Sequence, residues 1–161
     1  MKEKYLNRFD IYKLLLNKQP YNLDDLLNFD STKCVTFLNP FSIEQIKEKD
    51  LYERFDYICS DGIIPVLINN FFSRKKIKRI SFDMSSLAKD VFSKAQKEEQ
   101  TIYIVGSTIE NVSKFKCVVE GYFPNIRIVG ISDGYFGVTS QIIERIIKSE
   151  CKIVIVGMGY R

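Results

Sequence analysis

Short runs of β-branched and aromatic residues alternate with helical patterns along most of this chain. Such alternation predicts parallel strands joined by helices, because a parallel connection must return to the starting edge of the sheet. We therefore expect an α/β fold, with a Rossmann-like, mostly parallel sheet of about six strands and helices on both faces. The predicted strands are residues 33–38, 56–60, 78–82, 101–105, 126–131 and 152–156.

Helical spacing of apolar residues separates most of these strands. The most regular pattern covers 83–99, and 109–121 has an apolar face that we expect to point inward, formed by Val112, Phe115, Val118 and Val119. A cap by Ser42 is expected to begin a helix that reaches about residue 49. The remaining predicted helices are residues 8–17, 63–72 and 139–148.

The composition fits one domain, residues 1–161, and limits the available chemistry. There is no histidine, which excludes Ser-His-Asp and Cys-His catalysis and zinc sites with His ligands. Proton transfer would fall to Asp, Glu, Tyr, Lys or Cys. The net charge of +4 is too weak to indicate a dedicated nucleic-acid binder.

The cysteines and the N-terminal segment predict a cytoplasmic protein. None of the four cysteines forms a C-x-x-C pair, so we expect buried, free thiols in a reducing compartment. The first ten residues have no apolar segment typical of a signal peptide, and no apolar run is long enough to span a membrane.

Ligands of parallel α/β sheets bind at the carboxyl ends of the strands, so the residues that follow each strand are site candidates. Asp61 has two open interpretations, as a helix N-cap or as a catalytic acid beside a helix N-terminus. Asp83 has the same two. Gly106 and Ser107 form either a plain strand-to-helix turn or a phosphate site. Other candidates are Asn39, Asp133, Gly134, Tyr135, Gly157 and Gly159.

A cationic segment, residues 73–79, contains five Lys and Arg residues. It is either a solvated turn or a contact for an anionic membrane surface. A D-x-D motif is absent, so no pair of carboxylates at that spacing is available to hold a divalent ion on a diphosphate.

Several segments in order resemble the WecG/TagA/CpsF family of bacterial glycosyltransferases. They include a strand ending in Asn39, the Asp61-Gly62 turn, an Arg79-to-Asp83 segment and a D-G-Y-F loop from Asp133. The other matched segments are residues 104–107, 123–124 and 155–159, and the resemblance runs from about residue 33 to the end.

The resemblance implies transfer of an N-acetylmannosamine-type sugar, with inversion and without a metal or other cofactor, from UDP to a polyprenyl-diphosphate-linked acceptor in cell-surface polysaccharide synthesis. It implies that Asp61 is the base and that Arg79 neutralises the diphosphate. Such a protein would contact the inner face of the cell membrane peripherally. The implied substrate-binding residues are Thr36, Asn39, Asp83, Gly106, Ser107, Asp133, Gly134, Tyr135, Gly157 and Gly159.

The chain departs from the family pattern at several positions. Phe37 stands where teichoic-acid members carry Thr, Phe82 replaces a Gly, and Ser107 replaces the second Gly of V-G-G. The family's P-K-Q-E segment and tail have no counterpart here, so we expect a C-terminally truncated domain that transfers poorly and self-associates through its last strand.

Two other functions stay open. One is a catalytically inactive, truncated remnant that still binds a nucleotide sugar. The other, a small dehydrogenase-like Rossmann domain, is disfavoured because the G-x-G-x-x-G fingerprint is missing.

Overall fold

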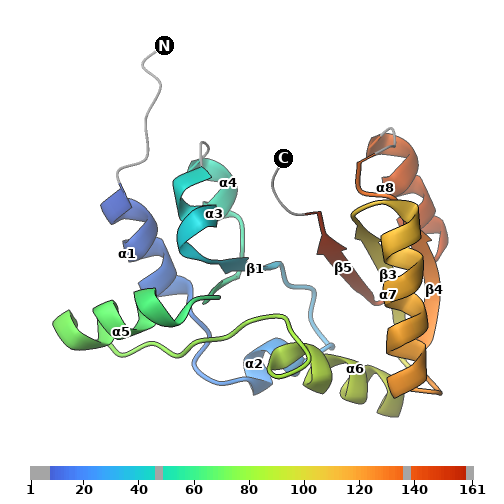
Figure 1. Ribbon diagram of the computed structural model, residues 1–161, viewed down its shortest axis with the longest axis horizontal. Coiled ribbons are helices and arrows are strands. Elements are labelled where there is room, and N and C mark those ends of the chain that lie inside the picture. The colour runs from blue at the N-terminus through green and yellow to red at the C-terminus, as the bar shows by residue number, and fades with distance from the viewer. Residues whose placement is uncertain (1–7, 46–48, 136–138, 159–161) are drawn as a thin grey trace. The chain divides into compact units, whose positions relative to one another are not determined.

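A computed structural model describes residues 8–45, 49–135 and 139–158 (Figure 1). The chain divides into two compact units, Met1–Lys89 and Asp90–Arg161, and each contains its own small parallel sheet. The α/β class and the parallel pairing are therefore confirmed. The described residues form five strands in two sheets rather than one sheet of about six.

The first unit is built on two parallel strands, β1 (Val35–Leu38) and β2 (Tyr57–Ser60), which pair in register from Val35↔Tyr57 to Leu38↔Ser60. Two short helices connect them, and α5 follows β2 with the bounds that the sequence predicts. Pro65 lies in the first turn of α5, where its missing N–H costs no helical hydrogen bond. The helices of this unit are α1 (Arg8–Lys18), α2 (Asp24–Leu27), α3 (Pro40–Gln45), α4 (Lys49–Glu53) and α5 (Ile63–Phe72).

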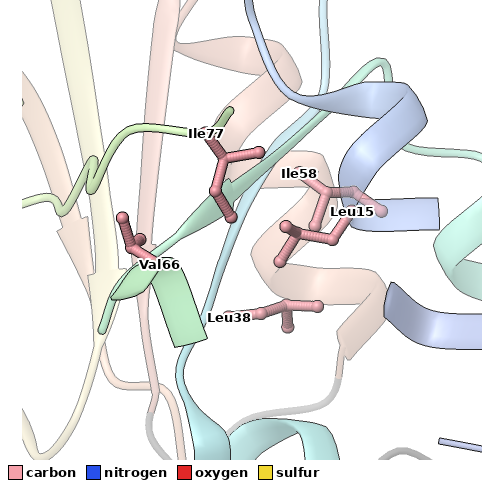
Figure 2. Packing of buried hydrophobic residues seen from close by; sticks show 5 residues of the cluster. All are labelled: Leu15, Leu38, Ile58, Val66 and Ile77. Carbon is pink, nitrogen blue, oxygen red and sulfur yellow. The ribbon is translucent and has the colours of Figure 1, made fainter. Parts of the chain in front are cut away.

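The core of the first unit joins one residue from each of five segments (Figure 2). Leu15 comes from α1, Leu38 and Ile58 from the two strands, Val66 from α5, and Ile77 from the extended segment after α5. All five side chains are at most 6% exposed. The cluster therefore fixes both strands and the cationic segment that contains Ile77.

The prediction of a strand at residues 78–82 is wrong. The pairing of this segment is reduced to one isolated parallel bridge, Ser60↔Arg79, in which the Ile80 N–H donates to the Ser60 carbonyl at 2.9 Å. The pairing ends there because side-chain hydrogen bonds around Asp83 turn the chain immediately afterwards. The following helix, α6 (Leu87–Lys97), consequently begins later than residue 83, and Met84 is 37% exposed.

The second unit has β3 (Thr101–Gly106) at the centre of a parallel sheet, between β4 (Arg127–Ser132) and β5 (Ile153–Gly157). Residues 102–105 of β3 are all buried, as expected of a central parallel strand. The connecting helices are α7 (Ile109–Tyr122) and α8 (Thr139–Lys148), and α8 has the predicted bounds.

Some predicted burial is wrong. On α7, Val112 and Val119 are buried, but Val118 is 54% exposed and Phe115 lies only partly covered. The helix packs against β3 and β4 through a stripe too narrow to include Val118.

The prediction for the cysteines is confirmed only in part. All four thiols are free, but Cys34 and Cys117 are exposed, and Cys151 is partly exposed. Cys59 on β2 is fully buried, and this burial raises the pKa of its thiol to about 12. Across the three described ranges, we find no helix long and apolar enough to cross a membrane.

Candidate active site

Asp61 follows β2 directly and is positioned by the sheet. Its backbone N–H donates to the Leu38 carbonyl at 2.8 Å, which extends the β1–β2 hydrogen bonding by one residue. The N-cap of α5 is Gly62, so the interpretation of Asp61 as the N-cap is wrong. The Asp61 side chain is one-third exposed and is left available for chemistry.

Arg79 is brought beside Asp61 by the isolated bridge, which sets Arg79 opposite the residue that precedes Asp61. The Arg79 Nη2 atom lies 3.7 Å from Asp61 Oδ1 and 3.2 Å from Asp83 Oδ2. One guanidinium nitrogen therefore pairs with two carboxylates from segments that are far apart in the sequence. Nη1 and Nε lie outside these two ion pairs.

Asp83 is held in its charged form by several hydrogen bonds. The Ser81 hydroxyl donates to Asp83 Oδ2, and the Ser85 N–H and hydroxyl donate to Oδ1 at 2.9 and 2.6 Å. These bonds, led by that from Ser81, lower the pKa of Asp83 to about 2. Asp83 therefore acts as a fixed anion that orients Arg79 and is a poor candidate for a base.

The environment of Asp61 raises the pKa of its carboxyl group, in contrast to that of Asp83. Burial is the largest influence and raises the pKa of Asp61, and the negative charge of Asp83 raises it further. The Arg79 charge opposes this increase without cancelling it. Two neighbouring carboxylates whose pKa values are pushed apart are typical of acid–base sites.

Ser81 and Ser85 were not identified by the sequence reasoning. The spacing Ser81-x-Asp83-x-Ser85 places two hydroxyls within reach of one carboxylate, which is the pattern of a side-chain-supported turn. That spacing was the available signal. The pairing of this turn with Asp61 has no local signal, because it depends on the bridge between Ser60 and Arg79.

Asn39 begins α3. Its Oδ1 accepts from the Ser42 N–H at 2.8 Å and from the Ser42 hydroxyl at 3.0 Å, with Pro40 as the first helical residue. The N-cap is therefore Asn39, and the prediction of Ser42 as the cap is wrong. Thr36 is a half-buried residue in the middle of β1.

The two departures Phe37 and Phe82 contact each other. Their ring centroids lie 5.8 Å apart at an interplanar angle of 53°. Phe82 lies between Ser81 and Asp83 in the chain, so this aromatic pair adjoins the segment that carries the carboxylate site.

In the second unit, three glycines bring backbones into close contact at the carboxyl ends of β3 and β5. Gly106 and Gly157 are register partners, and a Cβ at Gly106 would lie 2.5 Å from the Gly157 carbonyl oxygen. A Cβ at Gly134 would lie 2.9 Å from Met158 Cγ and 3.1 Å from Gly106 Cα. Close packing therefore leaves no room for a side chain at Gly106 and little at Gly134, whereas a Cβ at Gly157 would meet nothing within 4 Å.

Ser107 adopts a backbone φ of 47°, in the left-handed region that favours glycine. This explains in physical terms why a Gly is usual at this position in the family pattern. The Ser107 carbonyl accepts from the Gly134 N–H at 2.9 Å, and its hydroxyl accepts from the Asn111 side chain at 3.0 Å.

Asp133 and Tyr135 tie the loop after β4 to its neighbours. Asp133 Oδ2 accepts from the Ile109 N–H at 3.2 Å, and Oδ1 accepts from the Tyr135 N–H at 2.6 Å. The Tyr135 hydroxyl donates to the Met158 carbonyl at 2.6 Å. The Asp133 carboxylate therefore occupies a backbone N–H at the N-terminus of α7 that could otherwise bind an anion beside Gly106 and Ser107. Gly159 and Phe136 lie outside the described residues.

A small pocket of about 240 Å³ opens beside Asp133 in this unit. Gln141 and Arg145 contribute polar groups to it from one face of α8, and neither was identified from the sequence. Within the described ranges, no group of three or more Asp, Glu or Cys side chains gathers as a metal site would require. The pocket is lined by Ile109, Ile131, Ser132, Asp133, Gln141, Ile142 and Arg145.

Comparison with known proteins identifies the family. The family described as "Glycosyl transferase WecG/TagA/CpsF family" matches residues 6–161. The chain belongs to this family. The match includes the N-terminal helix α1, which lies before the residues that carried the sequence resemblance.

Three relatives have assigned activities. A UDP-Gal:alpha-D-GlcNAc-diphosphoundecaprenol beta-1,4-galactosyltransferase of Shigella boydii is 37% identical over 131 residues, covering 80% of this chain and 55% of the relative. An N-acetylglucosaminyldiphosphoundecaprenol N-acetyl-beta-D-mannosaminyltransferase of Bacillus subtilis is 24% identical, covering 78% and 50%. One of the same name from Bacillus spizizenii is 27% identical, covering 65% and 40%. The chain spans about half the length of these relatives.

Proposed function

We propose that this chain carries the acid–base centre of an inverting glycosyltransferase, which moves an N-acetylmannosamine-type sugar or a hexose from UDP to a GlcNAc-diphosphoundecaprenol acceptor. The observation that carries the proposal is the contact between Asp61, Arg79 and Asp83 in a member of a glycosyltransferase family. The activities named for the relatives support the acceptor, since each name includes a GlcNAc unit linked to diphosphoundecaprenol.

In this mechanism Asp61 accepts the proton of the acceptor hydroxyl while the hydroxyl oxygen attacks the anomeric carbon. The bond from that carbon to the UDP oxygen breaks, UDP leaves with the electron pair, and the configuration inverts. The raised pKa of Asp61 suits a general base, because the proton affinity of a base increases with its pKa. Arg79 stabilises the negative charge on the leaving diphosphate, and Asp83 holds Arg79 in place.

We propose that the nucleoside binds to the second unit, at the loop after β4. The pocket beside Asp133 supports this, since it combines apolar walls with the polar groups of Gln141 and Arg145. Charge neutralisation of the leaving diphosphate is assigned to Arg79, without a divalent ion.

Two donor sugars have support. N-acetylmannosamine follows from the sequence resemblance and from the names of the two Bacillus relatives. Galactose is favoured by the 37% identical relative, whose name specifies UDP-Gal.

The test supplies the protein with UDP-galactose or UDP-N-acetylmannosamine and a short-chain, water-soluble GlcNAc-diphospho-lipid, and measures UDP release and product mass. Acceptor-dependent release from one donor is expected. Binding of UDP without release from either donor would support an inactive nucleotide-sugar-binding remnant instead, and absence of UDP binding would contradict both.

The proposed location is the cytoplasmic face of the cell membrane, since the acceptor is lipid-linked. Self-association through the edge strand β5 is a further part of the proposal, because Val156 is 62% exposed there. Size-exclusion chromatography tests this part, and a monomer at all concentrations would contradict it.

A further inference from the structure

Helix α5 exposes a continuous apolar face. Six side chains at helical positions one and four apart are 49–82% exposed, whereas the opposite face, with Pro65, Val66 and Asn69, is buried. The two residues at the C-terminal end of this face are the most exposed and their rings contact each other, with centroids 4.9 Å apart. We call this set the α5 face: Ile63, Ile64, Leu67, Ile68, Phe71 and Phe72.

The cationic segment is fixed next to this helix. Asn69 Nδ2 donates to the Lys75 carbonyl at 2.8 Å. The Asn70 side chain both accepts from the Ile77 N–H at 2.8 Å and donates to the Ile77 carbonyl at 2.9 Å. Ile77 is also buried in the core cluster (Figure 2). The segment is therefore held at the C-terminal end of α5.

Apart from Arg79, which pairs with carboxylates, this segment has four exposed cations close to the C-terminal end of α5. Arg74, Lys75, Lys76 and Lys78 are all exposed, and Lys76 Nζ donates to the Asn70 carbonyl at the end of α5. The alternative interpretation of the cationic segment, a solvated turn, does not explain why exposed apolar side chains lie next to it. The observed combination of exposed apolar side chains and adjacent cations is typical of helices that lie in a membrane interface.

We propose that the α5 face and the cationic segment together form a docking surface for an anionic lipid bilayer. The apolar side chains would enter the boundary between headgroups and acyl chains, and the cations would contact anionic headgroups. The charges select this occupant, because four exposed cations follow the C-terminal end of the apolar face, next to Phe71 and Phe72, and complement anionic lipid. This inference deepens the proposed function, on which it rests for the lipid-linked acceptor.

The position in the chain suits that function. Asp61 immediately precedes the N-cap of α5, and Arg79 is the last residue of the cationic segment. The docking surface and the carboxylate site are thus parts of one continuous stretch of the first unit, residues 61–83. Binding of this stretch to lipid would hold the base near acceptors that are anchored in the same bilayer.

The test measures co-sedimentation of the 161-residue protein with two kinds of vesicle, phosphatidylcholine alone and phosphatidylcholine mixed with phosphatidylglycerol. One variant, Phe71→Ser/Phe72→Ser, removes apolar area from side chains that are 82% exposed, so its effect on folding should be small. A second, Arg74→Gln/Lys75→Gln, removes two charges.

Matched controls lie in the second unit. Tyr122→Ser/Ile147→Ser removes apolar side chains that are 70% and 68% exposed. Lys148→Gln/Lys152→Gln changes the net charge by the same amount as the charge variant, at exposed positions. Both controls should bind vesicles as the unchanged protein does.

We expect the charge variant to lose affinity on the order of 10-fold or more for the anionic vesicles only. The aromatic variant should lose affinity for both kinds of vesicle. Equal binding by the variants and their controls, or no vesicle binding by the unchanged protein, would overturn the proposal. A loss of dimer in the aromatic variant with vesicle binding intact would also overturn it, by making the α5 face a contact between copies.

A second measurement separates this inference from the proposed function. Transfer to the water-soluble acceptor does not require a bilayer, so both variants should retain it. Vesicle binding without any transfer would support the docking surface and contradict the proposed function. Transfer without vesicle binding would support the proposed function and contradict the docking surface.

Discussion

The close approach of β3 and β5 predicts an unequal response to alanine at two paired glycines. Gly106→Ala would place a methyl group 2.5 Å from the Gly157 carbonyl oxygen and 3.0 Å from the Gly157 carbonyl carbon. Ordinary contact begins at 3.4 Å, so the strand ends must separate by about 0.9 Å at this point. The obstructing atoms belong to the backbone and cannot rotate away. We expect a loss of unfolding free energy of about 1–3 kcal/mol.

Gly157→Ala is the matched control, because a Cβ there meets nothing within 4 Å. Its effect should stay within about 0.5 kcal/mol or be slightly stabilising. Thermal unfolding followed by circular dichroism should show a decrease of roughly 5–15 °C for Gly106→Ala only. Amide exchange at Ile104 and Val105 assigns the loss to the second unit. Equal decreases for the two variants, or none for Gly106→Ala, would refute the packing argument.

The other predictions concern charge, metal and backbone strain. Asp83→Asn removes a negative charge that raises the pKa of Asp61, so the acid limb of the kcat/KM profile should move to lower pH; a move upward would contradict the assignment. The lowered pKa of Asp83, about 2, means that its charge stabilises the unchanged protein above the ordinary pKa of an aspartate, and that this stabilisation disappears as the pH falls toward 2. Asp83→Asn should lack this pH-dependent part of the unfolding free energy, and acid unfolding measures it. UDP affinity measured by calorimetry should not change with EDTA. A large gain in affinity with a metal ion would contradict the assignment of Arg79 as the group that neutralises the diphosphate. Ser107→Gly should raise Tm by a few degrees, because relief of the left-handed backbone, roughly 1 kcal/mol, exceeds the loss of one exposed hydrogen bond; a lower Tm would mean that this bond dominates.

The helices were predictable where the sequence contains a stop signal or a sustained pattern. Pro65 in the first turn and the cationic segment after Phe72 fix the bounds of α5. The short helices α2 and α4, of four and five residues, escaped prediction because they are too short to show helical periodicity. Residues 78–82 alternate as a strand would, but hydrogen bonds to Asp83 end the pairing after one bridge.

The candidate site was predictable only in its outline. Asp61 and Arg79 were identified through the family resemblance, and the structure brings them within 3.7 Å. The different pKa values of Asp61 and Asp83 could not be read from the sequence, because both residues follow strand-like runs and precede helical patterns. Burial and the hydroxyl of Ser81 separate them, and both depend on tertiary contacts.

The central claim is that Asp61 is the base for glycosyl transfer. The most direct test compares transfer by the chain and its Asp61→Asn variant, with UDP affinity measured in parallel by calorimetry. Asp30→Asn, an exposed carboxylate in the same unit, is the control and should leave both quantities unchanged. We predict that Asp61→Asn lowers the transfer rate by ~10²–10⁴ while UDP affinity stays within a few-fold. An unchanged transfer rate in a folded Asp61→Asn variant would contradict the assignment of Asp61 as the base.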